Sequence, residues 1–212
     1  MLSADFDALA RFFSALICRF RYLYPPKMRE DQELQGVVRL PTLDPLLGYL
    51  PPNPLPYRVT LSDVHDLFVA KAPFRERREA LFTALSTYSA LVWEELPKAV
   101  IWIDGGFTTH KHWEAPDDVD VVVVADDVEL STKARMASQG LFTMTDVTAK
   151  ISLKEMPVIS KLRPFGGLVD AYFATSSTSE LLRRQFSQVR GPDGEIMTGV
   201  LKGIVEVTRG IG

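Results

Sequence analysis

The chain has 212 residues, of which 46% are hydrophobic and 24% are charged. This composition is ordinary for a folded domain and excludes a chain that is disordered throughout. A net charge of −3 excludes a uniformly basic, histone-like binder of nucleic acid, although a local basic face remains compatible with it. The single cysteine, Cys18, cannot form an intrachain disulfide, and no secretory leader pattern is seen, so we expect a cytoplasmic protein.

Residues 1–40 are predicted to form an N-terminal helical extension, and residues 41–212 the main domain. Apolar side chains recur at helical spacing from Phe6 to Leu16, and Pro25-Pro26 then breaks the pattern. The extension fits either an arm that binds a partner or a poorly ordered segment. Its most apolar run is much shorter than the roughly 18 residues needed to span a bilayer, so no membrane association is expected.

The first part of the main domain is predicted to be helical after a proline-rich loop. Residues 41–58 contain six prolines and are expected to wrap on the domain, rather than to serve as a ligand for a proline-binding module. Ser62 is the expected N-cap of a short helix. A longer helix is expected over 74–96, with one buried apolar face. Its first turns carry three arginines, predicted to form a solvated face or, alternatively, to meet a polyanion: Arg75, Arg77 and Arg78.

After Pro97 the pattern changes to strands that alternate with short helices. Strands are expected over 100–103, 119–124 and 168–174, with weaker candidates over 142–151 and 200–207. Helices are expected over 130–138 and from a capping box at Ser177 and Glu180 through Phe186. The predicted fold class is therefore α+β, with a mixed sheet flanked by helices.

Two aspartates at the start of the second strand point to metal chemistry. Asp118 and Asp120 lie at positions i and i+2, which places them on one face of a strand, about 7 Å apart. Two such charges repel each other by roughly 2 kcal/mol at an effective dielectric constant near 20, which a bound cation would offset. Residues 114–129 hold seven acidic residues and no Lys or Arg, which strengthens the interpretation.

A third aspartate lies inside a later apolar strand. Asp170 has Leu168, Val169, Ala171 and Tyr172 as neighbours, so its carboxylate must find a metal, a basic partner or a proton. Three carboxylates on neighbouring strands are typical ligands of Mg²⁺, and two such ions support phosphoryl or nucleotidyl transfer.

A glycine pair precedes the aspartates by about a dozen residues. Gly105-Gly106 allows the backbone to approach a phosphate closely. Thr108 and Thr109 would add hydroxyl donors and Lys111 a positive charge, while His112 and Trp113 are expected to edge the nucleotide pocket. His110-Lys111-His112 has no second pair of His or Cys ligands, so a zinc site is not expected.

Together these motifs resemble the nucleotidyltransferase fold of the DNA polymerase β superfamily. Within it, the chain is similar over about 45–208 to a bacterial family of stand-alone proteins related to the MenT-type toxins of toxin–antitoxin systems. The resemblance is carried by short elements that include Gly48-Tyr49-Leu50-Pro51-Pro52, Arg77-Arg78, Asp104 to Thr109, Pro116-x-Asp-Val-Asp and Lys202-Gly203-Ile204. The second position of the glycine pair is more often serine in such proteins, so Gly106 lacks that side chain's phosphate contact.

The resemblance implies an enzyme that transfers NMP from an NTP, often a pyrimidine, to the 3′ end of tRNA. Two Mg²⁺ ions, with Mn²⁺ as the alternative, would bind Asp118, Asp120 and Asp170. A lysine ahead of the third aspartate would contact the triphosphate; Lys154 is the first candidate, followed by Lys150 and then Lys161. A cognate antitoxin protein is an expected partner.

Three alternatives remain at this stage. The enzyme could transfer NMP to a protein, or the domain could bind a nucleotide without turnover. The same metals would also suit a phosphohydrolase. The chemical part played by Lys202-Gly203-Ile204 is not assigned by the sequence.

Overall fold

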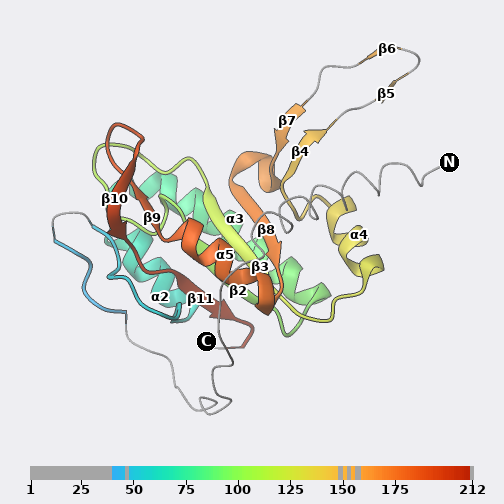
Figure 1. Ribbon diagram of the computed structural model, residues 1–212. Coiled ribbons are helices and arrows are strands. Elements are labelled where there is room, and N and C mark those ends of the chain that lie inside the picture. The colour runs from blue at the N-terminus through green and yellow to red at the C-terminus, as the bar shows by residue number, and fades with distance from the viewer. Residues whose placement is uncertain (1–39, 46–47, 148–149, 152–153, 156–158, 211–212) are drawn as a thin grey trace. The chain divides into compact units, whose positions relative to one another are not determined.

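The computed structural model describes residues 40–45, 48–147, 150–151, 154–155 and 159–210 (Figure 1). The predicted helical extension, apart from its last residue, lies outside the described residues. Contacts group residues 36–212 into one unit, and every described residue belongs to it. The boundary expected near residue 40 stays a prediction.

A five-stranded mixed sheet forms the centre of this unit. Its strands are, in spatial order, β1 (Tyr57–Arg58), β11 (Val205–Thr208), β2 (Val100–Asp104), β3 (Val119–Val124) and β8 (Val169–Ala174). β2 runs antiparallel to both of its neighbours, whereas β8 runs parallel to β3 and β1 runs parallel to β11. The predicted α+β class is confirmed, and the expected strands over 100–103, 119–124 and 168–174 all belong to this sheet.

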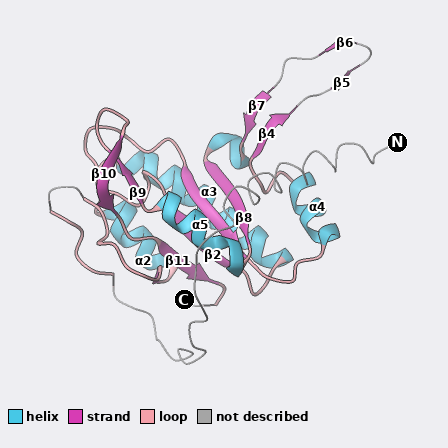
Figure 2. Cartoon of the chain, in the orientation of Figure 1, coloured by secondary structure: helices cyan, strands magenta, loops and turns pink. Residues whose placement is uncertain are grey.

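Helical segments connect and cover the strands. They are α2 (Leu61–His65), the π-helical turn η1 (Asp66–Ala70), α3 (Arg75–Glu95), α4 (Leu130–Ser138), the short 3-10 segment η2 (Pro164–Gly167) and α5 (Ser176–Phe186) (Figure 2). The three longer helices, α3, α4 and α5, follow the predicted ranges to within one residue at each end.

The predicted caps of two helices are wrong by two residues. Thr60, not Ser62, caps α2, and its hydroxyl accepts from the Asp63 N–H while the Asp63 carboxylate accepts from the Thr60 N–H. Thr175, not Ser177, caps α5. The chain offers Thr60 and Ser62 at the start of α2 and a run of Ser and Thr from residue 175 at the start of α5, and in both cases the extended backbone of the first residue selects it.

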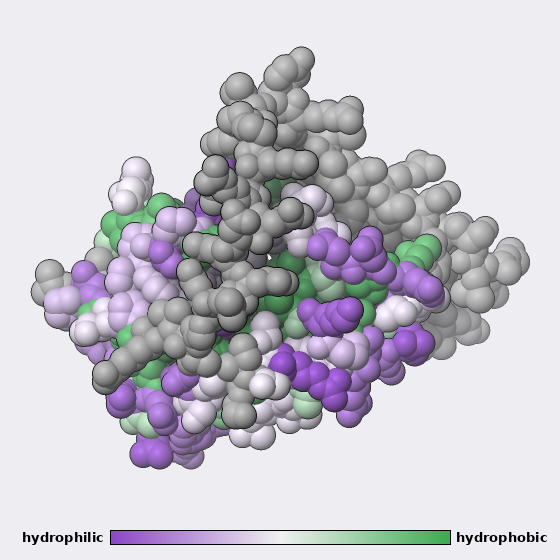
Figure 3. Space-filling view, turned by 90° about the horizontal axis from the view of Figure 1, so that it is seen from below, coloured by the Kyte–Doolittle hydropathy of each residue, from purple (hydrophilic) through white to green (hydrophobic). Residues whose placement is uncertain are grey.

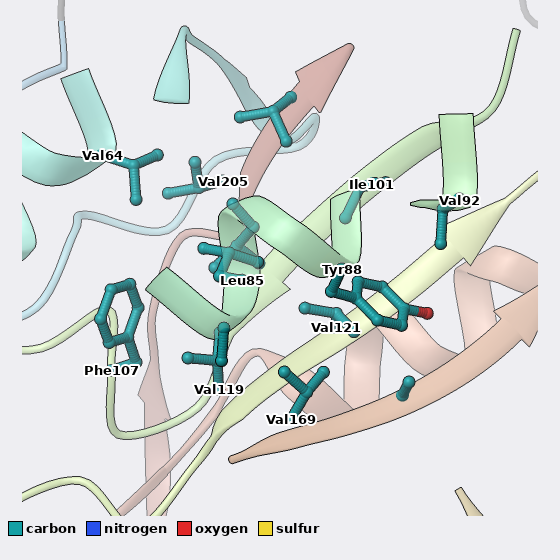
Figure 4. Close-up of a cluster of buried hydrophobic side chains, with 14 of the residues drawn as sticks. Val64, Leu85, Tyr88, Val92, Ile101, Phe107, Val119, Val121, Val169 and Val205 are labelled. Atoms are coloured by element: carbon teal, nitrogen blue, oxygen red, sulfur yellow. The ribbon is translucent and has the colours of Figure 1, made fainter. Parts of the chain in front are cut away.

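Helix α3 covers one face of the sheet and forms the main core. Strand residues at alternate positions point toward it, among them Ile101, Val119, Val121, Val169 and Val205. From α3 they meet Leu81, Leu85, Tyr88 and Val92, all fully buried (Figure 4). The period of two along the strands and of 3.6 along the helix explains this match.

The opposite face of the sheet carries α5 and a smaller core. Trp102, Val122, Ala174 and Ile204 are buried there, with Leu182 and Phe186 of α5 packed against them. Because strand side chains alternate between faces, Asp104, Asp120 and Asp170 fall on this second face, beyond the small core.

Three further pairs of strands form hairpins. β4 (Met144–Val147) pairs with β7 (Ile159–Leu162), and β5 (Lys150–Ile151) pairs with β6 (Lys154–Glu155) farther along the same excursion of the chain (Figure 1). β9 (Gln188–Arg190) pairs with β10 (Ile196–Leu201). The weaker candidate range 142–151 therefore contains two strands, β4 and β5, and the range 200–207 covers the end of β10 and most of β11.

No helix in the described ranges combines the length and the hydropathy that a membrane crossing requires. In the space-filling view, hydrophilic residues are interspersed with hydrophobic ones over the described part of the visible face (Figure 3). The large exposed apolar side chains come from separate elements, for example Leu55, Leu130, Leu181 and Leu201.

Candidate functional site

A row of carboxylates crosses three adjacent strands of the sheet. In the strand register, Asp120 of β3 pairs with Asp104 of β2 on one side and with Asp170 of β8 on the other. Asp118 lies two residues before Asp120, and its side chain therefore falls on the same face of the sheet. The structure thus brings the three predicted aspartates together and adds Asp104 to them.

Asp170 is almost fully buried and fully engaged. Its Oδ1 accepts a hydrogen bond of 2.7 Å from the Thr143 hydroxyl, and its Oδ2 accepts one of 3.1 Å from the Tyr172 hydroxyl. The Lys161 ammonium forms an ion pair with the same Oδ2. The carboxylate that the apolar strand seemed to leave alone is therefore compensated by a basic side chain from β7.

Asp118 is held by an arginine that also reaches toward Asp170. Nη1 of Arg163 lies 2.8 Å from Oδ2 of Asp118, and its Nε lies 3.9 Å from Oδ2 of Asp170. Burial raises the pKa of Asp118, while the charge of Arg163 opposes that effect. Arg163 is one-third exposed, so this ion pair is open to solvent on one side.

Asp120 differs from its neighbours because no described residue forms a hydrogen bond or an ion pair with its carboxylate. Burial raises its pKa to about 7, and the negative charges of Asp118, Asp104 and Asp170 add to that effect. A carboxylate in such surroundings gains from a bound cation, which would remove both the repulsion and the desolvation cost.

Asp104 forms a buried ion pair with a residue 98 positions later in the chain. The Lys202 ammonium contacts Oδ1 of Asp104 and also donates to the Gly105 carbonyl at 3.1 Å. Both side chains are 95% or more buried. Oδ2 of Asp104 is buried without a hydrogen-bond partner among the described residues. The pair connects the segment between β10 and β11 to the end of β2.

The glycine turn, residues 105–109, begins directly at the carboxylate row. Gly105 has a φ of +78°, and a Cβ at this position would lie 1.8 Å from Oδ2 of Asp120. Only glycine therefore allows both this backbone conformation and this position of Asp120. The Thr108 hydroxyl donates to Oδ1 of Asp104 at 3.3 Å, and the Thr109 hydroxyl donates to the Gly106 carbonyl at 2.8 Å. The two hydroxyls expected to face a phosphate are buried and stabilise the turn itself.

The prediction of a solvated arginine face at the start of α3 is wrong for Arg78. Arg78 is fully buried and donates to carbonyls of the glycine turn, of the segment before α3 and of η1. Arg77 donates to the Pro116 carbonyl at 3.1 Å and to that of Asp117. Of the three arginines, only Arg75 has a highly exposed side chain, and it forms an ion pair with Glu79. Helical periodicity fixes which residues share a face, but it does not say that an arginine stands on the buried one.

The lysines that were candidates for the triphosphate differ in their placement. The backbones of Lys150 and Lys154 lie in β5 and β6, and their side chains lie outside what the structure describes. Lys161, ranked behind them, is the one seen at Asp170. Lys111 pairs with Glu114 at 2.9 Å, and its ammonium lies 3.4 Å from the Cβ position of Gly106, so it stays beside the glycine turn.

Three residues of the site were not among the sequence candidates: Asp104, Arg163 and Lys202. Asp104 and Lys202 each belong to a short motif on which the resemblance to nucleotidyltransferases rests. A charged residue among apolar neighbours was the signal in the sequence that could have marked them as site residues. Arg163 precedes Pro164 in a basic stretch and carried no such signal. Their long separation along the chain hides the contacts from any local pattern.

A cleft of about 1000 Å³ opens next to the glycine turn. Lys111, His112 and Trp113 line one part of it, and Leu43, Leu67 and Lys71 line another. The rings of His112 and Trp113 meet edge to face with centroids 5.4 Å apart. The two residues expected to edge a nucleotide pocket therefore do line a cleft.

The donor set suits a hard cation such as Mg²⁺. Carboxylate oxygens are its preferred protein ligands, and Asp120 has no competing partner among the described residues. Over the described ranges, however, no three acidic, His or Cys residues stand in a ready coordination geometry. The basic side chains Lys161 and Arg163 hold two of the carboxylates instead, so they would have to release them when a cation binds.

The fold and the site define an α+β protein with an acidic cluster and a glycine turn on one face of a mixed sheet. The chain belongs to a family of unknown function, DUF6932, whose model matches residues 41–208. A search of the curated proteins and a search of the solved structures each gave no match.

Proposed function

We propose that the protein is a metal-dependent nucleotidyltransferase that transfers NMP from an NTP to an acceptor. The observation that carries the proposal is the strand register that aligns Asp104, Asp120 and Asp170 across three strands. Asp118 lies beside this row of carboxylates, and the glycine turn begins where the row ends at Asp104. Three of the four carboxylates form ion pairs with Lys161, Arg163 and Lys202, but Asp120 forms none within the described residues. The buried charge of Asp120 costs free energy unless the site binds a cation.

The residues that would hold Mg²⁺ are Asp118, Asp120 and Asp170. The carboxylate of Asp120, which has no ion pair within the described part of the chain and a pKa raised to about 7, supports this assignment. The buried, unpartnered Oδ2 of Asp104 adds a further oxygen to the same patch. When bound, the ions would lower the pKa of the attacking hydroxyl and neutralise the pyrophosphate that leaves. Lys161 and Arg163, which form ion pairs with Asp170 and Asp118, would bind the triphosphate once they are displaced from the carboxylates.

The glycine turn would bind the triphosphate and the cleft would bind the nucleoside. Lys111 lies between the two and would contribute positive charge. Trp113 and His112 offer aromatic faces on which a base could stack.

For the acceptor we propose the 3′ end of tRNA, in the cytoplasm, with the protein as the toxin of a toxin–antitoxin pair. The support for this part is the resemblance of the short motifs to MenT-type proteins. A protein acceptor is the alternative, and it uses the same site.

The test is incubation of the purified chain with each labelled NTP, Mg²⁺, total tRNA and cell protein. We expect label in tRNA from one or two NTPs, and loss of at least 100-fold in rate in D118N and D120N. The matched control is D127N, because Asp127 is an exposed acidic residue a few positions after the same strand. Label in protein but not in RNA would select the protein-modifying alternative, and no label in either would refute the transferase.

A second candidate is a nucleotide-binding module without turnover. The ion pairs Arg163–Asp118 and Lys161–Asp170 favour it, because basic side chains already neutralise two of the carboxylates. Calorimetry with each NTP separates the two functions. Binding of equal affinity with Mg²⁺ and with EDTA supports the module, whereas binding that requires Mg²⁺ supports the transferase.

A further inference from the structure

Arg78 is the largest fully buried side chain of the described residues, and it carries a positive charge. Its guanidinium donates to four carbonyls: Phe107 at 2.5 Å, Thr109 at 2.6 Å, Pro73 at 2.7 Å and Phe68 at 2.9 Å. All its hydrogen-bond acceptors are neutral, and within the described ranges no carboxylate forms an ion pair with it. Burial lowers its pKa to about 10, so the group remains protonated at neutral pH.

An uncompensated buried charge is costly, and folded proteins normally pair it. A methionine or leucine would remove the charge but would leave the four carbonyls without these donors. The carbonyls account for the donors of the guanidinium, whereas its full positive charge also favours an anion nearby, and the contacts indicate where. Two of the four carbonyls belong to the glycine turn, so the guanidinium lies directly behind that turn.

The turn is shaped so that its carbonyls are used internally. Arg78 engages those of Phe107 and Thr109, Lys202 engages that of Gly105, and the Thr109 hydroxyl engages that of Gly106. Carbonyl oxygens would repel a bound anion, and here each of these four is engaged by a donor of the protein itself. The charges that lie against the turn are the positive ones of Arg78, Lys202 and Lys111 and the negative ones of Asp104 and Asp120, so the ionised groups sum to +1.

We propose that Arg78 is a positioning residue for an anion bound on the glycine turn, and that this anion is the polyphosphate of the nucleotide. Arg78 fixes the turn through the Phe107 and Thr109 carbonyls, and its charge favours the anion without touching it. The inference rests on the proposed function for the identity of the ligand.

The experiment measures binding of inorganic tripolyphosphate and of NTPs to the full chain by calorimetry, in the presence of Mg²⁺. R78M removes the charge with little change of volume, and R78K keeps the charge but can satisfy at most three of the four carbonyls. R75M is the matched control, because Arg75 is an exposed arginine on the first turn of the same helix.

We expect R78M to weaken tripolyphosphate binding about tenfold or more, as the loss of a unit charge several ångströms away implies. R78K should retain most of the affinity, and R75M all of it. Affinity for the free nucleoside should not change in any variant. This measurement is the control for folding, because a variant that failed to fold would also lose the nucleoside. Wild-type affinity of a folded R78M for tripolyphosphate would overturn the inference.

Hydrogen exchange keeps the inference testable if R78M does not fold. In the wild type, tripolyphosphate should slow exchange of the amides of residues 105–109, and R78K, which keeps the charge, should retain most of that protection. Protection elsewhere in the chain, with none at the turn, would overturn the inference. Failure of the proposed function gives a different pattern, namely Arg78-dependent binding of tripolyphosphate at the turn without transfer from any NTP.

Discussion

The carboxylate of Asp120 occupies the space that a side chain at Gly105 would need. The ideal Cβ of residue 105 would lie 1.8 Å from Oδ2 of Asp120, and Gly105 has a φ of +78°. The glycine turn and the carboxylate row are therefore one structural unit, and neither can change without the other.

G105A is expected to destabilise the protein by more than the strain of a left-handed alanine alone. That strain is about 1 kcal/mol, and the clash with Asp120 adds to it. Gly140 offers a matched control, since it has a φ of +72° and nothing within 4 Å of its Cβ position. Urea unfolding should show a larger loss for G105A than for G140A. Equal losses would mean that Asp120 moves away at no cost.

K202M is expected to lower the free energy of unfolding by about 3–5 kcal/mol, because it leaves the Asp104 carboxylate buried without a cation. The double variant K202M/D104N removes both charges and should recover most of that loss. K98M serves as the control, since Lys98 is exposed. If K202M/D104N is no more stable than K202M in urea unfolding, the pair is not what holds this segment in place.

The stability of the wild type should fall, relative to D120N, as the pH rises from about 4 to about 7. The pKa of Asp120 is raised from 3.8 to about 7 in the folded protein, chiefly by burial. In that window the folded state keeps a proton that the unfolded state has released, so a higher pH favours unfolding. At pH 8 without divalent cations, D120N should be more stable than the wild type by up to about 4 kcal/mol.

Urea unfolding at pH 4, 6 and 8 checks this difference, and D127N should track the wild type throughout. Comparison with D120N cancels the opposite contributions of surface carboxylates whose pKa is lowered, such as Glu79 and Glu95. A difference between wild type and D120N that does not vary with pH would refute the prediction.

T143V is expected to cost about 1–3 kcal/mol, because it removes a hydrogen bond from a buried carboxylate. The Thr143 hydroxyl donates to Asp170 at 2.7 Å and accepts from the Ala171 N–H at 2.9 Å. T145V, an exposed position two residues later, is the control. Thermal unfolding should show a lower midpoint for T143V alone, and unchanged midpoints in both variants would contradict this reading of the contact.

Local patterns were sufficient to predict most elements of the fold. The β-branched run of 119–124, the apolar run of 168–174 and the helical periodicity of α3 each carry their signal within a few residues. Hydrophobic alternation also placed Asp118 and Asp120 on one face. The caps of α2 and α5 were misplaced, because nearby Ser and Thr residues compete for that position. The short strands β1 and β9 were missed, and the ranges 142–151 and 200–207 were each taken as one strand.

The sequence by itself determined the three central strands β2, β3 and β8 and the placing of Asp118, Asp120 and Asp170 in or beside apolar strands. Only the tertiary structure decided that Asp104 joins their row, that Lys202 and Arg163 neutralise two members, and that Arg78 lies buried behind the glycine turn. The physical reason is one of range. Helix and strand formation depend on neighbours within a turn or a pleat, whereas a buried charge finds its partner wherever the sheet order brings the chain back, here up to 98 residues away.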